Sequence, residues 1–306
     1  MKTSIPMLLI SSSAALWGII AIFVRKLTGF GFSSMEIVTL RVVTAAILLG
    51  IIGMIQYRDQ LKIALKDLPM FIGTGICSIV LFNWCYFSAI SQMNLSIAVI
   101  LLYTAPAFVT VLSYFFLKEK MNSIKLISVG GTILGCVLIA GVNAKAAVSI
   151  SGGGLLTGLG AGFGYALYSI FGKFALKKYT PFTVTFYTFI VAAITLLPLT
   201  GLWNKGQVLI SGDVVFYGIG LGLFPTVLAY LFYTKGLENV ETSKAAIIAT
   251  VEPIVATVLS VFLYDENFGV IQGLGSAIIL LSVLLINLPA GSGRKMLKQK
   301  ASIKND

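Results

Sequence analysis

The sequence contains no histidine and little charge, since only 11% of its 306 residues are Asp, Glu, Lys or Arg. The missing histidine excludes a histidine general base, a serine–histidine–aspartate triad and a histidine metal ligand. Soluble domains carry about 25% charged residues, whereas 58% of this chain is hydrophobic. A soluble enzyme, a disordered chain and a disulfide-stapled secreted domain are therefore excluded.

The sequence also has neither a reactive cysteine pair nor a phosphate-binding loop. The three cysteines, Cys77, Cys85 and Cys136, lie in apolar runs and form no CxxC pair, so we interpret them as small hydrophobic packing residues. The chain has no GxxxxGK[ST] phosphate loop, which argues against ATP-driven transport by this chain alone. No cofactor or metal is expected.

What the chain has instead is long apolar runs. A membrane-spanning helix needs about 20 mainly apolar residues, and ten such segments can be marked. The sequence therefore predicts an all-α integral membrane protein with ten transmembrane helices. The expected spans are 4–24, 34–55, 69–91, 95–117, 123–143, 153–175, 182–203, 212–234, 243–263 and 269–288.

The basic residues predict the orientation of these spans. If the N-terminus is cytoplasmic, the inner segments hold 17 Lys and Arg residues and the outer segments hold four. This bias follows the positive-inside rule and predicts that both termini lie in the cytoplasm. It also accounts for the net charge of +11 without a nucleic-acid partner. The basic tail at 290–306 is expected to lie near anionic lipid.

The chain contains an internal repeat. With an offset of 147 residues, Ser96–Ile139 aligns on Ser243–Ile286 without a gap, and identical pairs include Ser96/Ser243, Pro106/Pro253 and Glu119/Glu266. The predicted organisation is a first five-helix repeat at 1–148, a second at 149–289 and the tail at 290–306. Because five is odd, the second repeat must enter the membrane inverted, which is a recurring architecture of secondary transporters.

Several motifs carry a family resemblance. They are the Trp17-Gly18 pair, Arg41, and two stretches in which a mid-helix proline is followed by an acidic residue, Tyr103–Glu119 and Val251–Glu266. With the ten-helix repeat, the chain resembles the EamA-type branch of the drug/metabolite transporter superfamily. The resemblance implies an exporter of small metabolites whose central cavity is lined by helices 1–4 and 6–9, with helices 5 and 10 at the periphery. The second repeat departs at its start, where Tyr165-Ala166 replaces Trp17-Gly18.

Two charged residues lie inside predicted spans. Glu252 is near the middle of the ninth span, where a charge costs about 2.5–3.5 kcal/mol. It could bind a proton or a substrate amine, or it could tie its helix to a neighbour. Arg41 in the second span has three interpretations: an ion pair with Glu252, local pairing or snorkelling towards Glu36 and headgroups, or a clamp for an anionic substrate group.

The two repeated prolines, Pro106 and Pro253, are candidate hinges. Each should leave the carbonyl four residues earlier, at Leu102 or Ala249, without its usual partner. A broken helix is tolerated at membrane depth where neighbours or water satisfy it. Plain packing kinks are the alternative.

Other candidates for the cavity are polar or aromatic. Asn83 should make either an interhelical hydrogen bond or a substrate contact, because its own helix offers little beyond Tyr86. An aromatic wall suits aromatic or cationic solutes, although each ring alone could pack against lipid. The aromatic candidates are Trp17, Tyr86, Tyr103, Tyr165 and Tyr230.

These observations predict a secondary active or facilitative transporter in the cell membrane. The hypothesis is export of small metabolites such as amino acids by alternating access, with proton coupling through Glu252. The alternatives are a drug or cation efflux carrier and a facilitated-diffusion uniporter. An integral membrane enzyme is disfavoured because embedded charges are too sparse. The expected partners are a small-molecule substrate, protons and lipid, with the protein a monomer or homodimer.

Overall fold

The computed structural model describes residues 4–141, 151–264 and 269–288, and this part of the chain is helical with no strand. It contains ten helical segments that are long and apolar enough to cross a membrane. The fold class predicted from the sequence is therefore confirmed. The candidate spans run Ser4–Gly29, Ser34–Gln56, Leu65–Gln92, Leu95–Leu117, Ser123–Ala140, Gly152–Ala175, Pro181–Thr200, Gly212–Asn239, Thr242–Leu263 and Val270–Asn287.

Several of these spans consist of more than one helix. In the first half of the chain the helices are α1 (Ser4–Gly18), α2 (Ile20–Gly29), α3 (Ser34–Gln56), α4 (Leu68–Ile72), α5 (Leu81–Gln92), α6 (Leu95–Leu102), α7 (Ala105–Leu117) and α8 (Ser123–Ala140). In the second half they are α10 (Gly152–Ala175), α11 (Pro181–Thr200), α12 (Gly206–Leu209), α13 (Gly212–Gly222), α14 (Ala229–Asn239), α15 (Thr242–Ala249), α16 (Glu252–Tyr264) and α17 (Val270–Asn287).

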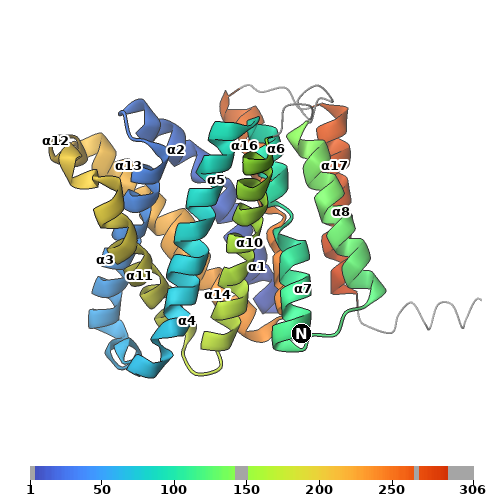
Figure 1. Ribbon diagram of the computed structural model, residues 1–306, viewed down its shortest axis with the longest axis horizontal. Coiled ribbons are helices and arrows are strands. Elements are labelled where there is room, and N and C mark those ends of the chain that lie inside the picture. The colour runs from blue at the N-terminus through green and yellow to red at the C-terminus, as the bar shows by residue number, and fades with distance from the viewer. Residues whose placement is uncertain (1–3, 142–150, 265–268, 289–306) are drawn as a thin grey trace, which may run out of the picture.

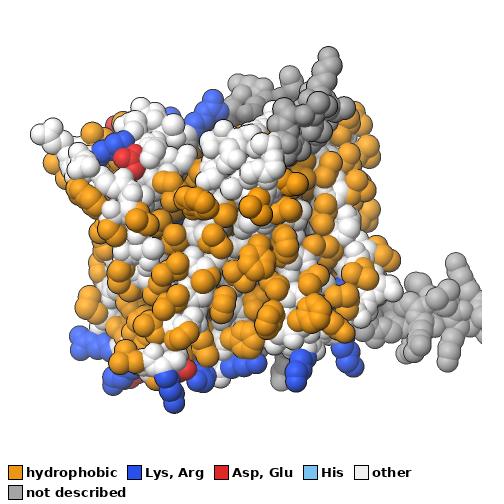
Figure 2. All heavy atoms as spheres, in the orientation of Figure 1, with side chains coloured by type: hydrophobic (Ala, Val, Ile, Leu, Met, Phe, Trp, Pro, Cys, Tyr) orange, Lys and Arg blue, Asp and Glu red, His pale blue; other side chains and the backbone are white. Residues whose placement is uncertain are grey.

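The two halves run in opposite directions. In Figure 1, α1 begins at the lower face of the bundle and α10 begins at the upper face. We call the end with the turns after α3, α7, α10 and α14 the lower face, and the other end the upper face. Lys and Arg side chains gather along the lower edge in Figure 2, below a wide belt of hydrophobic side chains. The inverted repeat predicted from the odd helix count is therefore present.

Helices from the two halves pack against each other. Helix α1 packs on α14, α15 and α16, α3 packs on α11 and α13, and α10 packs on α5, α6 and α7. Helices α8 and α17 lie side by side at one edge of the bundle (Figure 1). They approach closely because Gly135 leaves no room for a side chain: a Cβ there would lie 2.7 Å from the carbonyl oxygen of Gly275.

Five spans are irregular near their middle. The first breaks at Ile19, the fourth between α6 and α7, and the ninth between α15 and α16. The third and eighth spans instead contain π-helical segments, at Gly73–Val80 and Leu223–Leu228. Such π segments frequently occur at functional sites. The irregular segments therefore direct attention to the centre of the bundle.

The break in the fourth span explains how its proline is accommodated. Pro106 lies in the first turn of α7, where a helix needs no intrahelical N–H bond and proline is favoured. The fourth span is therefore two separate helices, and the hinge role of Pro106 stays a prediction. At the break, the Thr104 hydroxyl donates to the Leu101 carbonyl. At the ninth span, the Thr250 hydroxyl donates to the Ile247 carbonyl at 2.6 Å.

Polar contacts outside the membrane belt tie loops of the two halves together at the lower face. The Asp67 carboxylate accepts hydrogen bonds from Lys178 at 2.6 Å and from the Tyr179 hydroxyl at 2.7 Å. The hydrogen bond to Asp67 raises the pKa of the Lys178 ammonium. The loop after α3 is thereby fixed against the loop after α10.

Candidate functional site

An aromatic cluster lies at the centre of the bundle, where the irregular spans meet. The Trp17 ring at the end of α1 is 5.3 Å from the Tyr230 ring and 5.2 Å from the Tyr233 ring of α14. It is also 6.1 Å from the Tyr165 ring of α10. Trp17 and Tyr230 are only 6% and 7% exposed. The structure thus brings together three of the aromatic residues singled out in the sequence.

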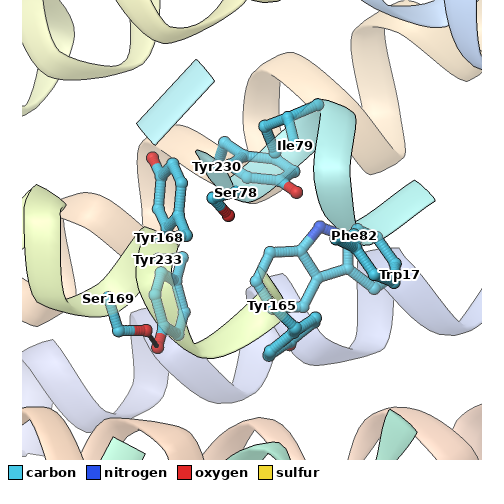
Figure 3. Close-up of a pocket in the computed structure, with 9 residues that line it drawn as sticks. All are labelled: Trp17, Ser78, Ile79, Phe82, Tyr165, Tyr168, Ser169, Tyr230 and Tyr233. Carbon is cyan, nitrogen blue, oxygen red and sulfur yellow. Dashed lines mark hydrogen bonds between the residues drawn. The ribbon is translucent and has the colours of Figure 1, made fainter. Parts of the chain in front are cut away.

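These rings surround a cavity of about 260 Å³, shown in Figure 3. Two hydrogen bonds fix its wall: the hydroxyls of Tyr168 and Thr234 are 2.7 Å apart, and those of Ser169 and Tyr233 are also 2.7 Å apart. The wall combines residues of both halves of the chain. The lining residues are Trp17, Ser78, Ile79, Phe82, Tyr165, Tyr168, Ser169, Tyr230 and Tyr233.

A second cavity of about 230 Å³ lies beside the breaks in the fourth and ninth spans. Tyr165 lines both cavities, so its ring forms a shared wall. Each of these volumes includes space open to the surroundings, and very little of it is wide enough even for a water molecule, so neither cavity holds a metabolite in this conformation. The second cavity is lined by Leu102, Tyr103, Ala105, Pro106, Tyr165, Ala246, Ala249 and Thr250.

Arg41 is a buried cation for which no salt bridge is found among the described residues. The residue is 7% exposed, and its Nε and Nη2 atoms make no hydrogen bond. Its charge interacts with Tyr230 and Glu252. Glu36, the other carboxylate considered for it, instead pairs with Lys205 at 2.8 Å. Arg41 therefore neither snorkels to the surface nor pairs with Glu36.

Glu252 begins α16, directly after the break in the ninth span. The N-terminus of a helix carries a partial positive charge, which favours a carboxylate at this position. The Glu252 side chain interacts electrostatically with Arg41 and with the side chain of Tyr103. The salt bridges within 4.0 Å that the described residues form do not include an Arg41–Glu252 pair. The two side chains therefore interact electrostatically without forming a direct salt bridge.

Asn83 is placed differently from the expectation. Its side-chain NH2 group donates to the carbonyl of Ile79 in its own span at 2.7 Å, so the predicted interhelical bond is not made by this group. The physical reason is that a helical side-chain amide can reach the carbonyl four residues earlier in its own segment, as Asn287 reaches Val283. Tyr86, one turn further on, stacks on Phe82 with ring centroids 6.0 Å apart and interacts electrostatically with Glu252.

The motif Trp17-Gly18 serves close packing as well as the cavity. A Cβ at Gly18 would lie 2.8 Å from the Cβ of Val255 in α16. At the corresponding place in the second repeat, Ala166 is fully buried and packs in one cluster with Val109. In the second repeat, the methyl group of Ala166 therefore packs where the first repeat has the hydrogen of Gly18.

The sequence analysis did not single out several cavity residues, among them Ser78, Phe82, Tyr233 and Thr250. Phe82 and Ser78 lie on the π-containing third span, and Tyr233 follows the named Tyr230 by three residues, on the same helix face. Thr250 is the counterpart of Tyr103 at the 147-residue offset. The helical spacing and the repeat could have identified Tyr233 and Thr250, whereas no sequence signal marks the π segment around Ser78.

Comparisons with known proteins agree with this architecture. A profile of the EamA-like transporter family matches the chain twice, at residues 4–141 and 152–288. An uncharacterized transporter of Archaeoglobus fulgidus is 27% identical over 89% of this chain and 93% of its own length. The uncharacterized transporter YwfM of Bacillus subtilis is 30% identical over 66% of this chain and 68% of its own length.

Two further similarities extend over most of the chain. The uncharacterized inner membrane transporter YicL of Salmonella typhimurium is 22% identical over 92% of this chain and 95% of its own length. A protein crystal structure with 16% sequence identity has a TM-score of 0.75 and covers 92% of this chain and 96% of that chain. At this identity the similarity to the crystal structure shows the fold alone.

Proposed function

Because the chain belongs to the EamA-like transporter family, and is thus a multi-pass membrane transporter, we propose that it exports small metabolites such as amino acids by alternating access. The support is that two inverted halves enclose central cavities to which both halves contribute. In secondary transporters with inverted repeats, the substrate site lies at the interface of the repeats near the bilayer midplane. Rocking one half against the other would expose such a site to each side in turn.

We propose that the lower face is cytoplasmic and that the protein resides in the cell membrane. Lysines and arginines of the inner segments are favoured on the cytoplasmic side. Exposed Lys62, Lys66, Lys118, Lys177 and Lys235 belong to the lower-face turns and helix ends. Both termini would then be cytoplasmic.

The pair Arg41 and Glu252 carries the proposed substrate chemistry. A buried guanidinium with unpaired N–H groups is a site for a carboxylate, because Arg presents a planar fork of donors. Glu252 would bind the ammonium group of the same molecule. The aromatic cluster around Trp17 would receive the side chain, since aromatic faces also attract cations. This arrangement is complementary to a zwitterion such as an amino acid.

Glu252 is also the proposed coupling site for protons. It lies next to the second cavity's Thr250 and interacts with Tyr103, which lines that cavity. A carboxylate there can bind a proton when the amine is absent and release it when the amine arrives. Export would then be driven by proton entry. A facilitated-diffusion uniporter, by contrast, would need no titrating group.

A drug or cation efflux carrier is the second candidate. The observation that favours it is the concentration of rings at the first cavity, where Trp17, Tyr165, Tyr168, Tyr230 and Tyr233 all contribute. Such a wall suits flat cationic molecules. In that case Arg41 would oppose substrate binding, and its removal would improve transport rather than impair it.

The test is counterflow in proteoliposomes that contain the purified protein, with a labelled amino-acid mixture and with a labelled quaternary ammonium ion. We expect exchange of amino acids, and we expect Arg41→Gln to raise KM about 10-fold or more, because a charge-assisted hydrogen bond contributes about 1.5–3 kcal/mol. Arg58→Gln is the matched control, since Arg58 is exposed at the lower face. Exchange of the ammonium ion alone, improved by Arg41→Gln, would replace the amino-acid proposal with the efflux alternative.

Proton coupling is tested with Glu252→Gln in the same vesicles. The variant should show counterflow only at a raised KM, because its amide oxygen still accepts a hydrogen bond from the ammonium without the charge, and it should lose uptake driven by a pH gradient. Glu238→Gln is the control, because Glu238 pairs with Lys235 at the lower face, 2.7 Å away. Unchanged gradient-driven flux in Glu252→Gln would rule out this carboxylate as the coupling site.

A further inference from the structure

The turn between α14 and α15 is held at its first end by a lysine. Lys173 of α10 donates to the carbonyls of Leu237, Glu238 and Val240 at 2.6, 3.3 and 2.9 Å. Carbonyls at the end of a helix lack intrahelical partners and carry a partial negative charge. A cation at this position therefore satisfies the end of α14.

The second end of the turn is held by a carboxylate. Glu119, in the turn after α7, accepts hydrogen bonds from the backbone N–H groups of Thr242 and Ser243 and from the Ser243 hydroxyl at 2.6 Å. These groups form the N-terminus of α15, where a negative charge is favourable. The side chain of Glu241, the N-cap residue, makes no capping hydrogen bond. Glu119 thus caps α15 from the other half of the chain.

A buried lysine completes the cluster. Lys125 at the start of α8 lies 3.5 Å from Glu119 and 2.9 Å from Glu241, with only 5% of its side chain exposed. Burial alone would raise the pKa of Glu119, but the hydrogen bonds from Ser243 and Thr242 and the charge of Lys125 outweigh it and lower that pKa. The carboxylate is therefore ionised at neutral pH, as a helix cap requires.

The backbone before Glu119 is shaped for this contact. Lys118 has a φ of 57°, in the left-handed region, which costs a non-glycine residue about 1–2 kcal/mol. This reversal ends α7 and lets the N–H of Glu119 bond back to the carbonyl of Ser113 at 3.1 Å. The side chain of Glu119 is thereby presented to α15 by a rigid turn.

The Lys173 contact and the Glu119 contact join different parts of the chain. Lys173, α10 and α14 all belong to the second half, so this contact lies within one half. Glu119 and Lys125 belong to the first half, whereas α15 belongs to the second. When two halves rock against each other, contacts within a half can persist, but contacts between the halves at a closed end must break, and at the lower face these include the Asp67–Lys178 contact as well as that of Glu119.

The repeat provides an internal comparison. At the 147-residue offset, Asn94–Ser96 at the start of α6 corresponds to Glu241–Ser243 at the start of α15. There the side chain of Asn94 accepts the N–H of Ser96 at 2.9 Å, so this helix start is capped by its own segment. The sequence counterpart of Glu119, Glu266, lies outside the described residues. Among the described residues, α6 is capped by its own Asn94, and α15 is capped by Glu119 of the first half.

We propose that the contact of Glu119 with Thr242 and Ser243 is a latch that holds the lower entrance closed and is released when the carrier opens to that face. The inference depends on the proposed alternating-access function for its role in transport. Its structural content is independent of the substrate: the contact between the halves stabilises one of two conformations.

The experiment measures the opening directly, by electron paramagnetic resonance distances in nanodiscs. Cysteines for spin labels replace exposed Phe116 and Asn239, at the lower ends of α7 and α14, in a variant whose three native cysteines are alanine. A second pair, at Lys177 and Asn239, lies within the second half. Glu119→Gln should raise the ratio of long to short distances about tenfold for the first pair and leave the second pair unchanged.

Two further variants make the result specific. Glu238→Gln removes a carboxylate near the same turn that, among the described residues, bonds Lys235 and Asn239. It should leave both distances unchanged. Ser243→Ala removes one of the three donors and should give a smaller shift than Glu119→Gln, which tests the latch even if the latter folds poorly. Unchanged distances in folded Glu119→Gln or in Ser243→Ala would overturn the latch.

Counterflow by the same samples separates the latch from the proposed function. A shifted distance without exchange of amino acids supports the latch and refutes the proposed substrate. Exchange at the wild-type rate with unshifted distances refutes the latch and leaves the proposed function intact.

Discussion

Replacing Gly18 by alanine tests the packing that places the cavity walls. A Cβ there would lie 2.8 Å from both the Cβ and the Cγ1 of Val255 and 3.1 Å from the backbone nitrogen of Ala256. Carbon atoms in contact prefer about 3.5–4.0 Å, so the overlap is about 1 Å. No change of rotamer can clear it, because the Cβ of Val255 is fixed to the backbone. Helix α1 must therefore move away from α16.

Such overpacking should destabilise the protein by about 1–3 kcal/mol, against an intrinsic gain of about 1 kcal/mol for Gly→Ala in a helix. Gly130→Ala is the matched control, because a Cβ at Gly130 meets nothing within 4 Å and reports the intrinsic gain alone. Thermal unfolding in detergent should separate the two variants by about 1–3 kcal/mol. Because α1 carries Trp17 and α16 carries Glu252, transport should fall as well. Equal stability of both variants would refute the close packing of α1 on α16.

Three other perturbations address separate parts of the molecule. Acid should weaken the Glu119 contact. The pKa of the Glu119 carboxyl is lowered in the folded protein, because its ionised form is the one that the contact stabilises. The contact therefore contributes its full stability above the ordinary carboxyl pKa of about 4.3, and this stability is lost as the pH falls through the lowered pKa. The unfolding temperatures of wild type and Glu119→Gln should therefore converge as the pH falls below the ordinary carboxyl pKa, and a constant difference would contradict this. Gly135→Ala should destabilise by about 1–3 kcal/mol in thermal unfolding, because its methyl group would meet Gly275 of α17, and wild-type stability would contradict that packing. Tyr168→Phe should cost about 1 kcal/mol in the same assay, because the buried Thr234 hydroxyl loses a partner, and an unchanged midpoint would mean that the bond contributes no net stability.

The sequence was sufficient for the architecture because membrane constraints are strong and local. Apolar runs about 20 residues long, the matched Pro106 and Pro253, and the basic bias predicted ten helices in two inverted halves. The limits of single spans were less accurate. The first span extends to Gly29 and includes Arg25 and Lys26, because a helix can continue past the apolar belt while long basic side chains reach water.

The central details depend on tertiary contacts that no local pattern encodes. The third span has a π segment without a proline, since Ser78 stands where the eighth span has Pro225. The sequence also could not show whether Asn83 would bond the carbonyl of Ile79 in its own span or a group on another helix. The repeat drew attention to Glu119 through its match with Glu266. Its role as a cap could not be predicted, because the sequence does not show that α15 of the other half begins beside it.

The most direct test of the account is the sidedness of access to Ser78, a small residue that lines the first cavity. Ser78→Cys, in a chain whose native cysteines are alanine, would be treated with a membrane-impermeant thiol reagent from either side of oriented vesicles. Alternating access predicts labelling from both sides, slowed by amino-acid substrate, while the reagent itself does not cross. Labelling from one side only under all conditions, or free passage of the reagent, would contradict it.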